Sequence, residues 1–282
     1  MGDIVSLKTL RFRHSGDIGD LISSLASVKE ICEKDRAKAI MVLDASGGWM
    51  DEHVKVQAPN GLKFNRKAAE FVEPLLNVQP YIAGVEIDDY GNKPVDFNLN
   101  AFRRYFLDRG SAIETNQNLM MLHQKACGLE IGYKGAWLVA PGDSIRHEFI
   151  LARTPRYQSS HIFCDAIKKA VVEHGEFIGT DFEHQLWKET FGYLPKRLQV
   201  KDMLEAANAI KSSDMFFSNG TAFYWVAVGL GHPNIYTEVG VQIPTTIFNT
   251  KGKWEAPDNI VYVEGYRQFK TSKSKEKIVG CE

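Results

Sequence analysis

The chain has 282 residues, which is enough for two domains with separate hydrophobic cores. Its 34 lysine and arginine residues nearly balance its 35 aspartate and glutamate residues, which argues against a strongly basic nucleic-acid-binding protein. Hydrophobic residues make up 44% of the chain, but no stretch reaches the roughly 18 apolar residues of a membrane-spanning helix. We therefore expect a cytoplasmic protein without stable membrane insertion.

The first half of the sequence alternates between strand and helix patterns. A short apolar strand near 10–12 leads into a glycine-containing turn, and apolar residues at helical spacing predict a helix over about 20–33. The run 37–44 has strand composition, so the three segments form a βαβ unit of a parallel sheet. Further along we expect a polar loop at 46–65, a helix at 66–78, strands at 82–87 and 95–99, an ambiguous stretch at 101–108, and a helix at 116–127 capped by Asn116.

The second half repeats this alternation after a segment rich in turn residues, 130–146, which is the expected linker. We expect strands at 149–152, 176–179, 198–200, 215–217 and 234–237, and helices at 161–173, 181–191, 202–212 and 221–230. The fold class is therefore α/β, with two Rossmann-like units that face each other across a cleft. Their expected bounds are 1–140 for the N-terminal domain and 147–270 for the C-terminal domain, followed by a solvated tail at 271–282.

The turn after the first strand is the first candidate site. Gly16 and Gly19 allow a tight turn, and the following helix start offers unpaired N–H groups and a positive dipole end to an anion. Asp20 adds a carboxylate at the edge of the crevice that open α/β sheets form at the carboxyl ends of their strands.

Two loops of the second half are suited to phosphate. Arg153, Thr154 and Arg156 follow its first strand, and a guanidinium pairs with phosphate oxygens through a planar fork that keeps its charge. The alternative is a pair of surface arginines. The second loop lies between an apolar strand and a helix start, which again provides N–H donors, although its composition is also that of an ordinary turn. It comprises Ser218, Asn219, Gly220 and Thr221.

The four cysteines are far apart in the sequence and form no C-x-x-C pair. We expect them to be reduced packing residues, neither disulfide partners nor zinc ligands.

The succession of these motifs resembles a known family. Residues 16–27, with a Gly-Asp pair before apolar residues, are similar to the opening of the lipopolysaccharide heptosyltransferases, which are ADP-heptose-dependent glycosyltransferases of the GT-B fold. Ala26 stands where that family has the proline of a Leu-Pro-Ala step. The order and spacing of the second half are also similar, at 153–156, 177–183, 204–210, 217–222 and 227–233.

The resemblance implies a GT-B fold and an inverting glycosyltransferase that needs neither a metal nor a cofactor besides its nucleotide-sugar co-substrate. It makes Asp20 the general base that takes the proton of the acceptor hydroxyl, with His14 and Asp17 as alternatives. It assigns the donor diphosphate to the loop 153–156 and the turn 218–221, and it places Glu183 near the nucleotide.

The donor sugar and the acceptor stay open. The family reads Asn-Asp-Ser-Gly-Pro-x-His where residues 219–225 read Asn-Gly-Thr-Ala-Phe-Tyr-Trp, so Gly220 and Trp225 replace an acid and a histidine that contact the sugar there. The acceptor candidates are a glycan, a small molecule or a hydroxymethylated DNA base. The alternative functions are a non-catalytic nucleotide- or sugar-binding relative and a sugar-nucleotide epimerase of the same fold.

Overall fold

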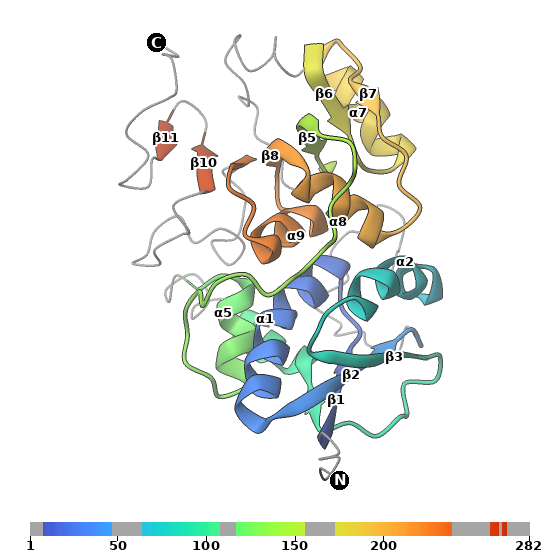
Figure 1. The fold of residues 1–282 in the computed structure, drawn as a ribbon, viewed down its shortest axis with the longest axis vertical. Helices are drawn as coiled ribbons and strands as arrows, with labels where there is room; N and C mark the ends of the chain where they lie inside the picture. Colours follow the sequence, from blue (N-terminus) through green and yellow to red (C-terminus); the bar gives the residue numbers. More distant parts are fainter. Residues whose placement is uncertain are drawn as a thin grey trace, which may run out of the picture.

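The computed structural model describes residues 8–46, 64–107, 117–155 and 173–238, together with two strands near the carboxyl end (Figure 1). The strands of the first half are β1 (Lys8–His14), β2 (Ala37–Asp44), β3 (Ile82–Asp88) and β4 (Phe97–Asn98). Its helices are α1 (Ile18–Asp35), α2 (Arg66–Asn77), α3 (Arg103–Leu107) and α5 (Leu119–Ala126), with a 3-10 turn, η2 (Leu99–Phe102).

The second half contains its own strands and helices. The strands are β5 (His147–Ala152), β6 (Gly175–Phe177), β7 (Lys196–Arg197), β8 (Ser213–Ser218), β9 (Ile235–Glu238), β10 (Ile260–Glu264) and β11 (Arg267–Phe269). The helices are α7 (Asp181–Phe191), α8 (Met203–Lys211) and α9 (Ala222–Leu230).

The strands form two sheets, one in each half of the chain. The first has the strand order β3-β2-β1-β4 and the second the order β11-β10-β9-β8-β5-β6-β7. The described strand pairs are parallel except for β10 with β11. Because parallel neighbours end at the same edge, each strand-to-helix turn places the start of a helix at that edge. The expected mixed α/β fold with two parallel sheets is confirmed.

The helices begin where the sequence supplies caps. Asn65, Thr180, Asp202 and Thr221 each accept a hydrogen bond from a backbone N–H three residues further on, which satisfies a donor that the helix itself leaves unpaired. The helix predicted at 116–127 is capped by Asn118 and begins at Leu119, so Asn116 as its cap was wrong.

Other predicted elements differ from the structure in smaller ways. The short strand predicted at 198–200 is β7, two residues earlier, where the chain pairs with the edge of β6. The stretch 101–108, left open by the sequence, continues η2 into α3. Nearly all of the loop 46–65 and of the helix 161–173 lies outside the described residues. None of the described helices combines the length and the apolar character that crossing a bilayer requires.

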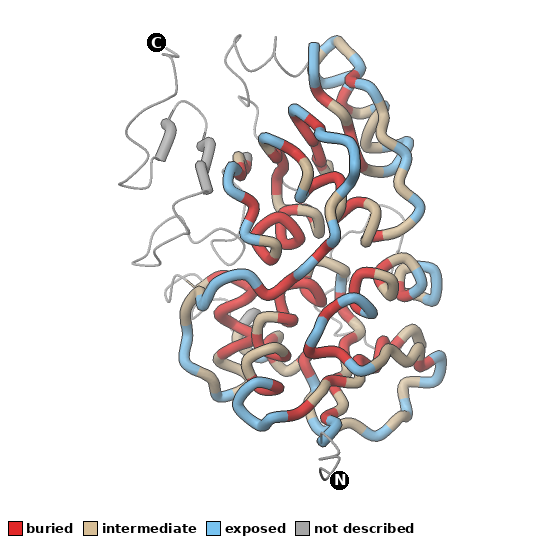
Figure 2. Tube along the Cα trace, viewed as in Figure 1, coloured by how far each residue is buried: buried red, intermediate tan, exposed pale blue. Residues whose placement is uncertain are grey.

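The larger hydrophobic cluster of the described residues spans both halves. Helix α1 packs against α9, and α2 packs against α8, so buried positions continue from one half into the other (Figure 2). The segment 130–146 has no helix or strand, as expected of a linker, but its middle is buried. Trp137 donates from its indole to the Ile22 carbonyl at 3.0 Å, and its backbone N–H donates to Gly229 at 2.9 Å. The segment therefore ties α1 to α9.

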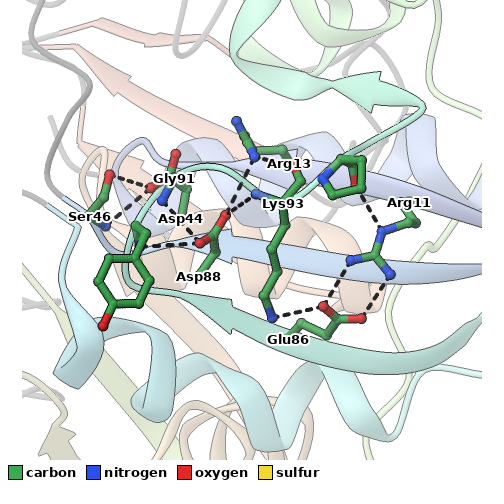
Figure 3. A network of polar contacts seen from close by, with 10 residues as sticks. Arg11, Arg13, Asp44, Ser46, Glu86, Asp88, Gly91 and Lys93 are labelled. Carbon is green, nitrogen blue, oxygen red and sulfur yellow. Dashed lines mark hydrogen bonds and ion pairs between the residues drawn. The ribbon is translucent and has the colours of Figure 1, made fainter.

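A polar network covers the face of the first sheet opposite the buried side chains of β1 (Figure 3). Arg11 binds Glu86 with both terminal nitrogens, at 2.9 and 2.8 Å, and Lys93 donates to the same carboxylate at 2.9 Å. These hydrogen bonds lower the pKa of Glu86 to about 2. The carboxylate therefore stabilises the fold in its ionised form.

Replacing Glu86 with glutamine is expected to lower the free energy of unfolding by about 1 kcal/mol at pH 7, a discounted value because the pair is partly exposed. A carboxylate whose pKa is lowered by folding stabilises the folded state fully at pH values above its unfolded pKa. The stability difference between wild type and Glu86→Gln should therefore shrink as the pH falls from about 4.5 to about 2. Urea denaturation at pH 7 and pH 3 measures it. Glu70→Gln, at an exposed ion pair on α2, is the control and should change stability by less than about 0.5 kcal/mol. An equal loss at both pH values for Glu86→Gln would contradict the account.

Candidate active site

A cavity of about 580 Å³ lies where the two halves meet. The first half lines it with Asp17, Gly19 and Asp20, besides residues of α2 and α5. The second half lines it with the end of β5, the turn after β8 and the starts of three helices. Residues that the sequence assigned to acceptor and donor are therefore brought to one space.

Six of the described helices begin at this cavity, and α1, α7, α8 and α9 do so directly after a strand of one of the parallel sheets. Residues from the cap or first turn of each helix belong to its wall, and these include Asp20 of α1, Ala68 of α2, Leu119 of α5, Glu183 of α7, Met203 of α8 and Ala222 of α9. Each helix start carries the positive end of a dipole and N–H groups without helical partners. The combined field favours an anionic group in the cavity.

Among the described residues, Arg153 and Lys67 are the cations that line the cavity. Arg153 directly follows β5 and is only 4% exposed, and its guanidinium lies 5.1 Å from the centre of the Phe191 ring. Lys67 is the second residue of α2, in the first half of the chain, and is exposed. A guanidinium fixed by packing and an exposed ammonium together suit a phosphate group.

The turn after β8 is locked to the loop after β5. The Asn219 amide accepts from the Thr154 N–H at 3.0 Å and donates to the Thr154 carbonyl at 2.8 Å, so it pairs with Thr154 as a neighbouring strand would. Ser218 is fully buried at the end of β8, so Ser218 and Asn219 lie behind the cavity wall. Thr154, Gly220 and Thr221 line the cavity itself, and Thr221 also caps α9.

Glu183 lines the cavity but already has a structural role. Its carboxylate accepts from the Thr180 N–H at 2.8 Å and from the Thr180 hydroxyl at 2.9 Å, which completes a capping box at the start of α7. Only the part of the carboxylate that these bonds leave uncovered can contact a ligand. Arg156 lies outside the described residues.

The three candidate bases near the opening turn lie in different surroundings. Asp17, the residue directly before α1, is exposed and lines the cavity. Asp20 also lines it, and its carboxylate forms an ion pair with Arg103 of α3. His14 is completely buried and accepts a hydrogen bond from the Gly16 N–H at 3.1 Å. Burial lowers the pKa of His14 well below its usual value, with smaller contributions from His123 and Arg103.

Two glycines of this turn have different surroundings. Gly16 is buried and does not line the cavity. A Cβ on Gly16 would lie 2.7 Å from the Arg103 guanidinium and 2.9 Å from the His14 ring, so the glycine leaves room for both side chains. A Cβ on Gly19 would meet Trp225 at 3.5 Å, an ordinary contact. Gly19 is where the start of α1 approaches the start of α9.

Replacing Gly16 with alanine is expected to lower the free energy of unfolding by about 1–3 kcal/mol, since a buried ring and a buried ion pair must shift. Gly19→Ala is the matched control and should cost less than about 1 kcal/mol, because its Cβ fits and alanine favours the helix. Chemical denaturation of both variants measures the difference. Equal effects of the two substitutions would show that the space around Gly16 is not tightly filled.

Comparison with known proteins gives structural matches only. No protein-family model and no curated protein matches the sequence. A glycosyl transferase family 9 protein from Veillonella parvula superimposes with a TM-score of 0.58 at 10% sequence identity, over 91% of this chain and 86% of that one. This chain has the GT-B fold.

Two other solved structures match less well. The iron-containing dodecameric glycosyltransferase TibC from enterotoxigenic E. coli has a TM-score of 0.49 at 12% identity, over 89% of this chain and 63% of its own. The ADP-heptose LPS heptosyltransferase II of E. coli also has a TM-score of 0.49, at 11% identity, over 91% of this chain and 90% of its own.

The GT-B fold explains why one cavity receives helix starts from both halves. The sequence identified neither Arg103, which pairs with Asp20 behind the cavity, nor Lys67, which lines it, because neither follows a strand in a recognisable motif. Adjacent arginines at 103 and 104, in a stretch that had no clear pattern, were the only signal for the first of them. Trp225 also lines the cavity, packed edge-on against Tyr224 with ring centres 5.2 Å apart.

Proposed function

We propose that the chain is a glycosyltransferase, which binds a nucleotide sugar in the cavity between the two halves and transfers the sugar to a hydroxyl acceptor. One observation carries the proposal. The cavity places the carboxylates of Asp17 and Asp20 in the same space as Arg153 and the start of α9, so a proton acceptor and an anion site are within reach of one ligand.

The donor diphosphate fits the second half. Arg153 pairs with its oxygens, Thr154 and Gly220 bring backbone close to it, and the start of α9 adds N–H donors. These groups stabilise the negative charge that grows on the diphosphate as the bond to the sugar breaks. In this proposal they supply the positive charge for the leaving group, so no metal is included.

The acceptor fits the first half. A hydroxyl that attacks the anomeric carbon from the side opposite the diphosphate loses its proton to Asp20, and the single displacement inverts the configuration of the sugar. The electron pair of the broken bond leaves on the nucleoside diphosphate. The acceptor classes to be tested are a glycan, a small molecule and hydroxymethylated DNA.

Incubation with ADP-, UDP-, GDP- and CMP-sugars, each with members of these acceptor classes, tests the proposal. We expect release of one nucleoside diphosphate that depends on an acceptor, persists in EDTA, and yields a product of inverted configuration. Saturable binding of a nucleotide sugar without release would favour a non-catalytic binding protein. Recovery of an epimerised nucleotide sugar would favour an epimerase, and either result would contradict the proposed transfer.

A further inference from the structure

A compact group of charged and aromatic side chains lies behind the cavity wall. Arg103, the first residue of α3, forms an ion pair with Asp20 in the first turn of α1. The exposed fractions of the two side chains are only 11% and 13%. His14 and His123 are completely buried beside them, with ring centres 6.0 Å apart. Asp20 contributes to the cavity wall, and Arg103 reaches it from behind.

The Arg103 guanidinium contacts two neighbours that hold it in place. Its central carbon lies 4.9 Å from the centre of the Phe102 ring. It also lies against Gly16, where a Cβ would stand 2.7 Å from the guanidinium and 3.1 Å from the Asp20 carboxylate. The orientation of the ion pair is therefore set by packing, and such pairs lose less side-chain entropy when they form than exposed ones do.

Among the described residues, the two histidines beside the ion pair carry no charge at neutral pH. Burial lowers the pKa of His123 to about 3, with a further contribution from the positive charge of Arg103, and His14 is affected in the same direction. Both rings are therefore neutral at physiological pH. Helix α9, on the other side of α1, has no charged residue, nor does η2. Asp17, in the same turn as Asp20, is the other charged group on the start of α1.

We propose that Arg103 is a positioning residue, which holds the Asp20 carboxylate ionised and in one orientation at the cavity wall for proton transfer. This inference rests on the proposed glycosyl transfer. In that step the acceptor O–H proton moves to Asp20 while the oxygen bonds to the anomeric carbon. The bond from that carbon to the diphosphate oxygen breaks, and its electron pair leaves with the nucleotide. Arg103 itself does not touch the reacting atoms.

The test compares Arg103→Met and Arg103→Lys with Arg104→Met, a substitution at the adjacent exposed arginine. We expect Arg103→Met to lower kcat about 10–100-fold while KM for the donor changes less than about threefold. The acid limb of its pH–rate profile should move to higher pH, because a carboxylate without a guanidinium neighbour holds a proton more tightly. Arg103→Lys should restore most of the rate and the limb, and Arg104→Met should match the wild type.

Thermal unfolding of each variant separates positioning from folding. If Arg103→Met does not fold, Arg103→Gln takes its place, since it keeps polar contacts without the charge. An unchanged pH profile in a folded variant, or a rate loss that lysine does not rescue, would overturn the inference while leaving the transferase proposal intact. If the wild-type chain releases no nucleotide with any donor and acceptor, the proposed function fails, and the inference fails with it.

Discussion

Replacing Asp20 with asparagine is expected to lower the rate of nucleotide release by about 10²–10⁴-fold, the range for loss of a general base. The amide has nearly the same shape as the carboxylate but cannot take the acceptor proton. Because Asp20 lies on the first-half side of the cavity, the Kd for a nucleoside diphosphate should change less than about threefold. Single-turnover assays with saturating donor, together with calorimetric titration of the nucleotide, measure the two quantities.

Asp17→Asn is the control for this prediction. Asp17 lines the same cavity on the same turn but is exposed, so its loss should lower the rate by about tenfold or less. The reverse order, with Asp17→Asn the more damaging change, would move the base from the buried pair to the exposed carboxylate. His14 is not an equivalent candidate, since its ring is buried and does not line the cavity.

Replacing Trp187 with alanine is expected to lower the free energy of unfolding by about 3–5 kcal/mol, the usual cost of removing a buried tryptophan. Trp187 is 1% exposed on α7, with ring centres 5.7 Å from Phe177 and 4.7 Å from Phe191. Trp187 and Phe177 belong to a second hydrophobic cluster, with residues of β5 and β8, and Phe191 packs against it. Because Phe191 supports the Arg153 guanidinium, nucleotide affinity should fall as well.

Phe182→Ala is the matched control for Trp187, because Phe182 is on the same helix but 58% exposed. Its substitution should change stability by less than about 0.5 kcal/mol. Urea denaturation followed by circular dichroism measures both variants. A loss below about 1 kcal/mol for Trp187→Ala would mean that α7 and its cluster contribute little to the folded state.

Much of the fold could be predicted from the sequence because local signals agree there with tertiary packing. The bounds of α7 match the prediction, since a Thr-x-x-Glu cap precedes its apolar positions and Gly192 ends it. The bounds of β2 also match, since a buried parallel strand is a continuous apolar run. The edge strand β7 is two polar residues held only by pairing with β6, so its own sequence did not locate it.

The sequence predicted those residues of the candidate site that lie at the ends of strands and the starts of helices. Eight of the residues chosen from the sequence line the cavity, namely Asp17, Gly19, Asp20, Arg153, Thr154, Glu183, Gly220 and Thr221. Gly16, His14, Ser218 and Asn219 are buried and do not line it. His14 and Ser218 are the last residues of their strands, where successive side chains alternate between the two faces of the sheet. Arg103 comes from a segment that only tertiary packing brings to α1, so no sequence spacing predicts it.

Calorimetric titration with ADP, UDP, GDP and CDP measures whether the cavity binds a nucleotide sugar through its diphosphate. We expect one saturable site for at least one nucleotide, weakened about 100-fold in Arg153→Gln, since a buried charge-assisted contact contributes about 1.5–3 kcal/mol. Arg146→Gln, at a side chain that is 78% exposed, should bind as the wild type does. Absence of binding to all four nucleotides, or equal binding by Arg153→Gln, would contradict this expectation.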